Sequence, residues 1–135
     1  MGCNVGYRSD VAIAAYGDKE KLVELKAHYD NAVVNLSVDA LEDFNYLVAS
    51  SEANLARPIW DDETGDFMFY VTHVKWYDGY PVVDLFNTLF GKAIAIELAA
   101  ERVRIGEEIE DNEEEFEDGD EGCEYRFNVS RSISF

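Results

Sequence analysis

The sequence predicts an α+β fold, in which two or three helices cover one face of a largely antiparallel sheet. Three observations predict it. Segments with an apolar residue at every second position, typical of strands, occur along the chain between segments with helical spacing. The chain has 135 residues, which suits one domain, and 47% of them are hydrophobic, which is enough for a core. No internal repeat or long linker divides the chain, so residues 1–135 are predicted to form a single domain.

The chain is predicted to begin with a strand followed by a helix. The strand covers residues 7–16, where apolar residues fall on one side at Val11, Ile13 and Ala15. Asp18 then offers a side chain that caps the first free amide groups of a helix. Apolar residues recur every three or four positions over residues 19–33, which predicts that this helix has one buried face.

Residues 35–58 fit two structures. A helix that starts after Ser37 and runs to Val48 is favoured, because its apolar residues have helical spacing. A strand over residues 44–50 is the alternative. Either element must end by Arg57, because the residue before a proline avoids the helical conformation.

The segment over residues 67–77 is the clearest predicted strand. It is apolar on both faces, which predicts a central position in the sheet. Pro81 then suits the first turn of a helix, since its missing amide would be unpaired there anyway. Apolar residues have helical spacing from Val82 to Ile94, and Gly91 either ends the helix or lies inside it, since the following AIAIELAA over residues 93–100 is a good helix former. A strand around residues 103–105 and a closing strand over residues 125–132 complete the sheet.

An acidic run separates the last two predicted strands, and we expect it to form a loop or hairpin at about residues 107–124. No Lys or Arg interrupts it between Arg104 and Arg126. A block of like charge is often only a solvated surface loop, and this interpretation stays open. As candidate binding residues we take its carboxylates Glu107, Glu108, Glu110, Asp111, Glu113, Glu114, Glu115, Glu117, Asp118, Asp120 and Glu121.

The alternative interpretation is that the acidic run imitates a nucleic-acid strand. An extended chain advances about 3.3 Å per residue. One DNA strand carries a negative charge about every 3.4 Å along its axis. A carboxylate-rich extended segment therefore approaches the charge density of a phosphate strand and could occupy a groove lined by Lys and Arg.

The charge of the whole chain excludes several classes of partner. With 11 basic and 29 acidic residues, the net charge is -18. Such a chain is not expected to bind nucleic acid directly, because DNA attracts basic patches, nor to dock on an anionic membrane. No apolar run approaches the roughly 20 residues of a membrane span, and no secretion signal is visible.

No catalytic, cofactor or metal motif is found. His73 and Lys75 lie two apart in the predicted strand, but a packed lysine stem whose amine reaches acidic neighbours is favoured over an acid–base site. Cys3, Cys123 and His28 lack the spacing of zinc ligands, and the acidic run does not fit a calcium-binding loop. We therefore predict no enzyme activity, no cofactor and no metal site.

Four short motifs carry a resemblance to a known family. They are GYRSDV at residues 6–11, KWY at 75–77 followed by Tyr80-Pro81, RIGEE at 104–108, and NVSRSI at 128–133. In this order they resemble a family of small acidic proteins of tailed bacteriophages. The resemblance carries no settled activity and assigns no functional residue. It implies expression in the cytoplasm of an infected bacterial host, where small acidic phage proteins often bind host proteins that handle nucleic acid.

Charge and resemblance together predict a function. The expected protein is a non-enzymatic acidic inhibitor that binds a basic site on a host nucleic-acid-handling or defence protein, of the anti-CRISPR or anti-restriction type. Trp76, Tyr77 and Tyr80 are candidate anchors, for which ordinary core packing is the favoured alternative. The alternative function is a small structural or assembly protein, with a homodimer left open, whose acidic surface only keeps it in solution.

Overall fold

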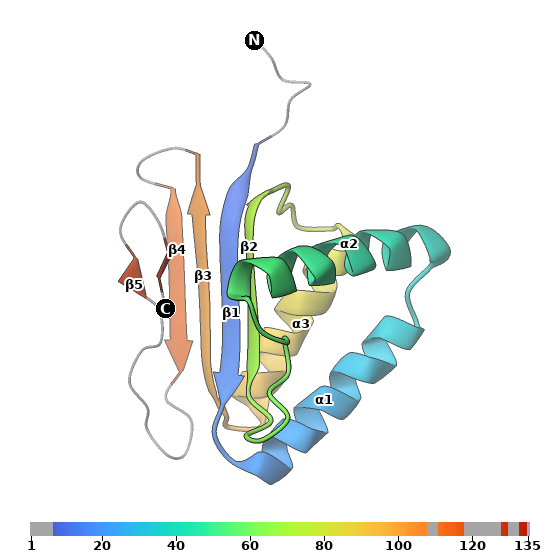
Figure 1. Ribbon diagram of the computed structural model, residues 1–135, viewed down its shortest axis with the longest axis vertical. Coiled ribbons are helices and arrows are strands. Elements are labelled where there is room, and N and C mark those ends of the chain that lie inside the picture. Colours follow the sequence, from blue (N-terminus) through green and yellow to red (C-terminus); the bar gives the residue numbers. More distant parts are fainter. Residues whose placement is uncertain (1–6, 108–110, 118–127, 130–132, 135) are drawn as a thin grey trace.

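The computed structural model describes residues 7–107, 111–117, 128–129 and 133–134. Within them, three helices pack against a four-stranded antiparallel sheet (Figure 1), which confirms the predicted α+β class. Helix α2 follows the outer edge of β2, and Leu55 near its end joins the buried cluster on the opposite face of the sheet from Phe69. The strand order in this sheet is β2-β1-β3-β4. The elements are β1 (Ser9–Tyr16), α1 (Lys19–Val34), α2 (Val38–Leu55), β2 (Phe67–Val74), α3 (Pro81–Ala95), β3 (Ala99–Gly106) and β4 (Asn112–Glu117), followed by a separate hairpin of β5 (Asn128–Val129) and β6 (Ile133–Ser134).

The first two helices begin at the predicted caps. The Asp18 carboxylate accepts hydrogen bonds from the amides of Glu20 (2.8 Å) and Lys21 (3.3 Å) at the start of α1. The Ser37 hydroxyl accepts from the amide of Ala40 (3.2 Å) at the start of α2. Helix α2 runs through residues 44–50 to Leu55, so the alternative of a strand there is wrong.

Helix α3 also begins as predicted, with Pro81 in its first turn. Gly91 lies inside the helix, which continues to Ala95. Residues 93–100 are not one helix, although their composition favours it: strand β3 begins at Ala99, where Ala99 and Ala100 already pair with Tyr16 and Ala15 of β1.

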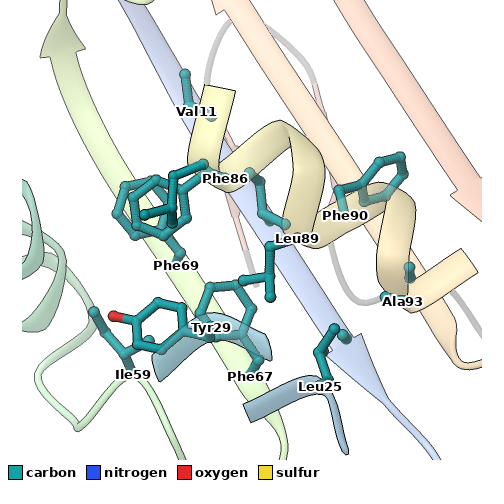
Figure 2. Packing of buried hydrophobic residues seen from close by; sticks show 14 of the residues in the cluster. Val11, Leu25, Tyr29, Ile59, Phe67, Phe69, Phe86, Leu89, Phe90 and Ala93 are labelled. Atoms are coloured by element: carbon teal, nitrogen blue, oxygen red, sulfur yellow. The ribbon is translucent and has the colours of Figure 1, made fainter. Parts of the chain in front are cut away.

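The main core lies between the helices and the facing side of the sheet. Figure 2 shows its centre, where the ring of Phe69 from β2 stacks on Phe86 from α3 with their centroids 4.1 Å apart. Tyr29 brings α1 into the same cluster, with its ring centroid 6.1 Å from that of Phe67. The other side of the sheet carries a second buried cluster, which includes Ala12, Met68 and Ile105.

The prediction that residues 67–77 form a central strand is wrong. Strand β2 ends at Val74 and is the first strand in the sheet order. Its outer edge is covered from outside the sheet: the amide of Tyr70 donates to the Ser51 hydroxyl of α2 (2.9 Å), and the amide of Met68 donates to the Ile59 carbonyl (2.9 Å). The strand is nevertheless apolar on both faces, as in a central strand, because Phe69 packs in the main core and Met68 packs in the cluster on the other face of the sheet.

The prediction of one closing strand over residues 125–132 also needs correction. In the described part, Asn128 pairs with Ser134 and Val129 pairs with Ile133 in an antiparallel register. The chain therefore reverses between β5 and β6. Alternation of apolar and polar residues continues on both sides of such a reversal, so periodicity alone predicted a single strand. Residues 125–127 and 130–132 lie outside the described residues.

Candidate functional site

The described part of the acidic run is a strand at the end of the sheet. Strand β4 pairs with β3 in an antiparallel register that sets Glu115 opposite Arg102 and Glu113 opposite Arg104. The amide of Gly106 donates to the Asp111 carbonyl (2.7 Å) where the hairpin closes. Because residues opposite one another on neighbouring strands point to the same face, two acidic side chains meet two basic ones.

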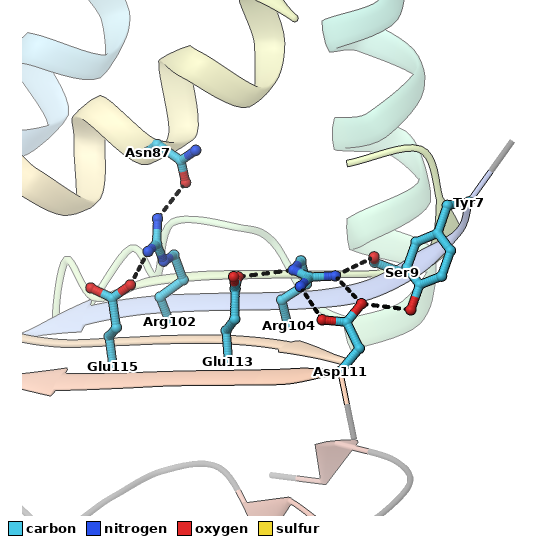
Figure 3. Close-up of polar contacts among 8 residues, drawn as sticks. All are labelled: Tyr7, Ser9, Asn87, Arg102, Arg104, Asp111, Glu113 and Glu115. Atoms are coloured by element: carbon cyan, nitrogen blue, oxygen red, sulfur yellow. Dashed lines mark hydrogen bonds and ion pairs between the residues drawn. The ribbon is translucent and has the colours of Figure 1, made fainter. Parts of the chain in front are cut away.

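Arg104 is the centre of the larger cluster, shown in Figure 3. Its Nε donates to Glu113 (2.9 Å), and its Nη2 donates to Asp111 Oδ1 (2.6 Å). Its Nη1 donates to the Ser9 hydroxyl (3.0 Å) and to Asp111 Oδ2 (3.2 Å). The Tyr7 hydroxyl also donates to Asp111 Oδ2 (2.5 Å). The guanidinium thus ties the starts of β1 and β4 to β3.

Hydrogen bonds from Arg104 to Asp111 and Glu113 raise the pKa of Arg104 above its ordinary value. The side chain is only 15% exposed, so solvent screens these pairs less than surface pairs. Arg104 therefore keeps its charge, and with it the pairs to the ionised Asp111 and Glu113, at neutral and alkaline pH.

Arg102 forms the second cluster on the same face. One terminal nitrogen donates to Asn87 Oδ1 of α3 (2.7 Å), and the other contacts the Glu115 carboxylate (Figure 3). The guanidinium carbon also lies 5.1 Å from the centre of the Phe90 ring. Arg102 therefore joins β4 to helix α3.

Gly106 makes room for the larger cluster. A Cβ atom at this position would collide with the carboxylate of Asp111 and with the hydroxyl of Tyr7. Only glycine allows these groups to approach the backbone of β3 so closely.

A cavity of about 510 Å³ opens beside the two arginines. Trp76 and Tyr77, two of the predicted anchors, line it together with Asp111 and Glu113 from the acidic run. The structure therefore brings together parts of both predicted groups. Tyr80 lines a different cavity, although its ring centroid lies 5.4 Å from that of Tyr77.

The three predicted anchors differ in their surroundings. Trp76 is half-buried against Phe69 and Phe86, with centroids 6.1 and 6.3 Å away, which is the core role foreseen as the alternative. The Tyr77 hydroxyl accepts a hydrogen bond from the amide of Tyr7. Only Tyr80 is well exposed, at 45% of its surface.

The predicted acidic residues also divide into groups. Asp111, Glu113 and Glu115 pair with the arginines, although Glu113 and Glu115 remain 57% and 48% exposed. Glu107 accepts from the amide of Arg8 (3.2 Å). Glu114 and Glu117 are exposed and make no ion pair with another described residue. The candidates that lie outside the described residues are Glu108, Glu110, Asp118, Asp120 and Glu121.

The arginines are the part of this site that sequence reasoning missed. A signal was present: basic residues at 102 and 104 and acidic residues at 113 and 115 have the same two-residue spacing on either side of a short connection. In a hairpin, this spacing sets opposite charges on one face.

The structure does not support the expected role of Lys75, whose amine was to reach acidic neighbours. Lys75 follows the end of β2 and makes no ion pair with another described residue. Within the described part of the chain, no group of three or more His, Cys, Asp or Glu side chains is placed to hold a metal ion. No described helix is both long and apolar enough to cross a membrane. Cys3 and Cys123 lie outside the described residues.

No family model, curated protein or solved structure matches this chain.

Proposed function

We propose that this protein is a non-enzymatic acidic binding protein, and that its β3–β4 hairpin occupies a basic site on a partner that handles nucleic acid. The observation that carries the proposal is the charge of the hairpin. Its described residues from β3 to Glu117 bring six carboxylates of the acidic run together with only two guanidinium groups. The hairpin therefore keeps a negative charge after its internal pairs are counted.

The internal pairs also favour binding. Arg102 and Arg104 hold Glu115 and Glu113 in fixed positions, while about half of each carboxylate surface stays exposed. A carboxylate that is already ordered loses less side-chain entropy when a partner arrives. Glu114, on the opposite face, and Glu117 add charge without an internal ion pair among the described residues.

The expected mechanism is electrostatic matching and not chemistry on a substrate. Complementary charge raises the rate of association and lowers the affinity of wrong partners, and both effects weaken with salt. The resemblance to small acidic phage proteins makes a host defence or nucleic-acid-handling protein in the bacterial cytoplasm the proposed partner, as in anti-CRISPR or anti-restriction inhibitors.

A second candidate function has its own observation in its favour. Strand β4 is the last strand of the four-stranded sheet, and charged side chains on such a strand discourage pairing with other chains. On this account the acidic strand protects a structural or assembly protein from aggregation. The two functions predict opposite results when the charges are removed.

The test uses two variants with the same change of charge. Glu114→Gln with Glu117→Gln neutralises the strand, and Glu42→Gln with Asp62→Asn neutralises two exposed carboxylates elsewhere. Each purified protein is used to capture partners from bacterial lysate at low and high salt, and excess DNA is added to elute them. We expect the wild type and the control to retain a DNA-binding protein that DNA releases, and the strand variant to retain several-fold less.

Equal capture by all three proteins, or capture that DNA does not compete, would contradict the proposal. Light scattering separates the second candidate function. If the acidic strand only protects the sheet, the variant neutralised in β4 will form larger species while the control stays unchanged.

A further inference from the structure

A second cavity, of about 400 Å³, lies beside β2, the strand at the opposite edge of the sheet from β4. It is formed by α2, by the end of β2 and by the start of α3. Its basic side chains are Arg8, His73 and Lys75, and Asp43 is the only carboxylate among its described lining residues. Its volume is within the usual range for sites that hold small molecules, about 300–1,000 Å³.

An irregularity in β2 shapes this cavity. Ser9 pairs with Val74 and Val11 pairs with Val71, so two residues of β2 lie opposite the single residue Asp10. This is a β-bulge, and its second residue, His73, has a positive φ of 55°. The Asp10 carboxylate accepts from the amide of His73 (2.9 Å) and holds this conformation.

The consequence is that four consecutive residues, 72–75, all line the cavity. A regular strand would send alternate side chains to opposite faces. Bulges of this kind redirect side chains at sheet edges and are frequent beside functional sites. Here the bulge lets Thr72 line the same cavity as His73 and Lys75.

The basic side chains at this cavity differ from those in the rest of the molecule. Among the described residues, six Lys and Arg side chains have a hydrogen-bond or ion-pair partner: Lys19, Lys21, Lys26, Lys92, Arg102 and Arg104. Arg8, Arg57 and Lys75 have none among these residues, and two of these three line the cavity. The Nε of Arg8 is buried and lacks a hydrogen-bond partner in the described part of the chain. Basic side chains that form no ion pair with the described carboxylates are available to an anion.

Aromatic and apolar groups complete the lining. Tyr46 of α2 and Tyr80 before α3 are 71% and 45% exposed, and both border the cavity. Valine and proline side chains from the start of α3 form an apolar wall. Exposed aromatic rings beside a basic pocket suit a ligand that has a flat ring at one end and an anionic group at the other.

We propose that this cavity binds a mononucleotide, with its phosphate between Arg8 and Lys75 and its base against Tyr46 and Tyr80. Arginine and lysine are the usual partners of phosphate oxygens, and arginine binds them through two parallel donors. The hydroxyls of Ser50 and Thr72 and the carboxylate of Asp43 provide the polar groups that would hold the sugar and base. The proposal concerns a site distinct from the β3–β4 hairpin and does not depend on its function.

The test is isothermal titration of the full chain with three probes: AMP, inorganic phosphate and adenosine. We expect AMP to bind more tightly than either of the other two, since only AMP has both recognised parts. Arg8→Gln and Lys75→Gln should each weaken AMP binding about tenfold or more, because each removes hydrogen bonds to a charged group. Tyr46→Ala should weaken the binding of AMP but not of phosphate.

Arg57→Gln is the matched control, because Arg57 also lacks a described partner but lies outside this cavity. It should change AMP affinity by less than twofold. The absence of binding at millimolar AMP would overturn the proposal, as would an equal loss in Arg57→Gln. AMP that binds no more tightly than adenosine would show that the cations do not recognise phosphate, and AMP no tighter than phosphate would overturn the assignment of the base.

Discussion

The two edges of the sheet, at β4 and at β2, differ in whether their basic side chains are paired with carboxylates. At the β4 end, Arg102 and Arg104 lie opposite carboxylates in register and are paired within the protein. At the β2 end, Arg8 and Lys75 line a cavity, and their side chains form no ion pair with a described carboxylate. Paired charges fix the shape of a surface and contribute to stability, whereas unpaired charges remain available to a ligand. The difference separates residues that hold the fold from residues that bind.

The largest expected effect comes from removing one cation at each end. Arg104→Met leaves Asp111 and Glu113 without their main partner in a half-buried site, and we expect it to lower the free energy of unfolding by about 2–3 kcal/mol. Lys75→Met removes no described ion pair and should change it by less than about 0.5 kcal/mol. Urea unfolding of both variants measures the difference. Similar losses in the two variants would mean that the ends do not differ in this way.

A smaller effect is expected from adding one methyl group beside the Arg104 cluster. Gly106→Ala forces the Asp111 carboxylate and the Tyr7 hydroxyl away from β3, and should cost about 1–2 kcal/mol of stability. Gly91→Ala is the control, since a Cβ there meets nothing within 4 Å and Gly91 lies inside α3. Removing a glycine from a helix interior should stabilise the protein by about 0.5–1 kcal/mol. Thermal unfolding should thus shift in opposite directions, and a shift in the same direction would show that Gly106 is not needed for close approach.

The smallest effect is expected at high pH, at the β2 end. Burial, with a contribution from Asp10, raises the pKa of Tyr70 above its ordinary value of 10.0. The unfolded chain therefore loses the Tyr70 proton first, and the folded state loses stability as the pH rises above about 10. Tyr70→Phe should make the alkaline loss of stability shallower. Tyr29, whose pKa burial also raises, is unchanged in both proteins, so its contribution cancels.

Arg104, at the β4 end, should not contribute to the loss of stability at high pH. Arg104 already has a raised pKa, so it keeps its charge and its pairs through the same pH range. Unfolding curves at pH 8 to 11 for the wild type and for Tyr70→Phe provide the comparison. An alkaline slope that is identical in the two proteins would contradict the assigned role of Tyr70.

Most of the fold could be predicted from local patterns. The caps at Asp18 and Ser37 and the proline at the start of α3 are short-range signals, and the structure confirms all three. The position of β2 could not be predicted in this way, because both of its faces are buried as in a central strand, while α2 covers its outer edge through a contact between Ser51 and Tyr70. That contact joins residues far apart in the sequence.

For the candidate sites too, local patterns predict some features, while others depend on contacts between distant residues. The acidic run was visible as composition, but its pairing with Arg102 and Arg104 depends on the register of β3 and β4. The sequence predicts that His73 and Lys75 lie two apart in one strand. The shape of the cavity that they share with Arg8 depends on a β-bulge opposite Asp10, and the pattern of apolar and polar residues does not predict this bulge. Long-range register and irregular backbone are therefore the parts that the sequence left open.

One measurement tests the contrast between the two ends most directly: amide NMR spectra of the full chain, titrated separately with AMP and with a short arginine-rich peptide. We expect AMP to shift the amide signals of residues 72–75, and the peptide to shift those of β4, with little overlap between the two sets. A peptide that shifts the acidic surfaces of α1 and α2 as strongly as β4, or an AMP titration that leaves residues 72–75 unchanged, would contradict the account.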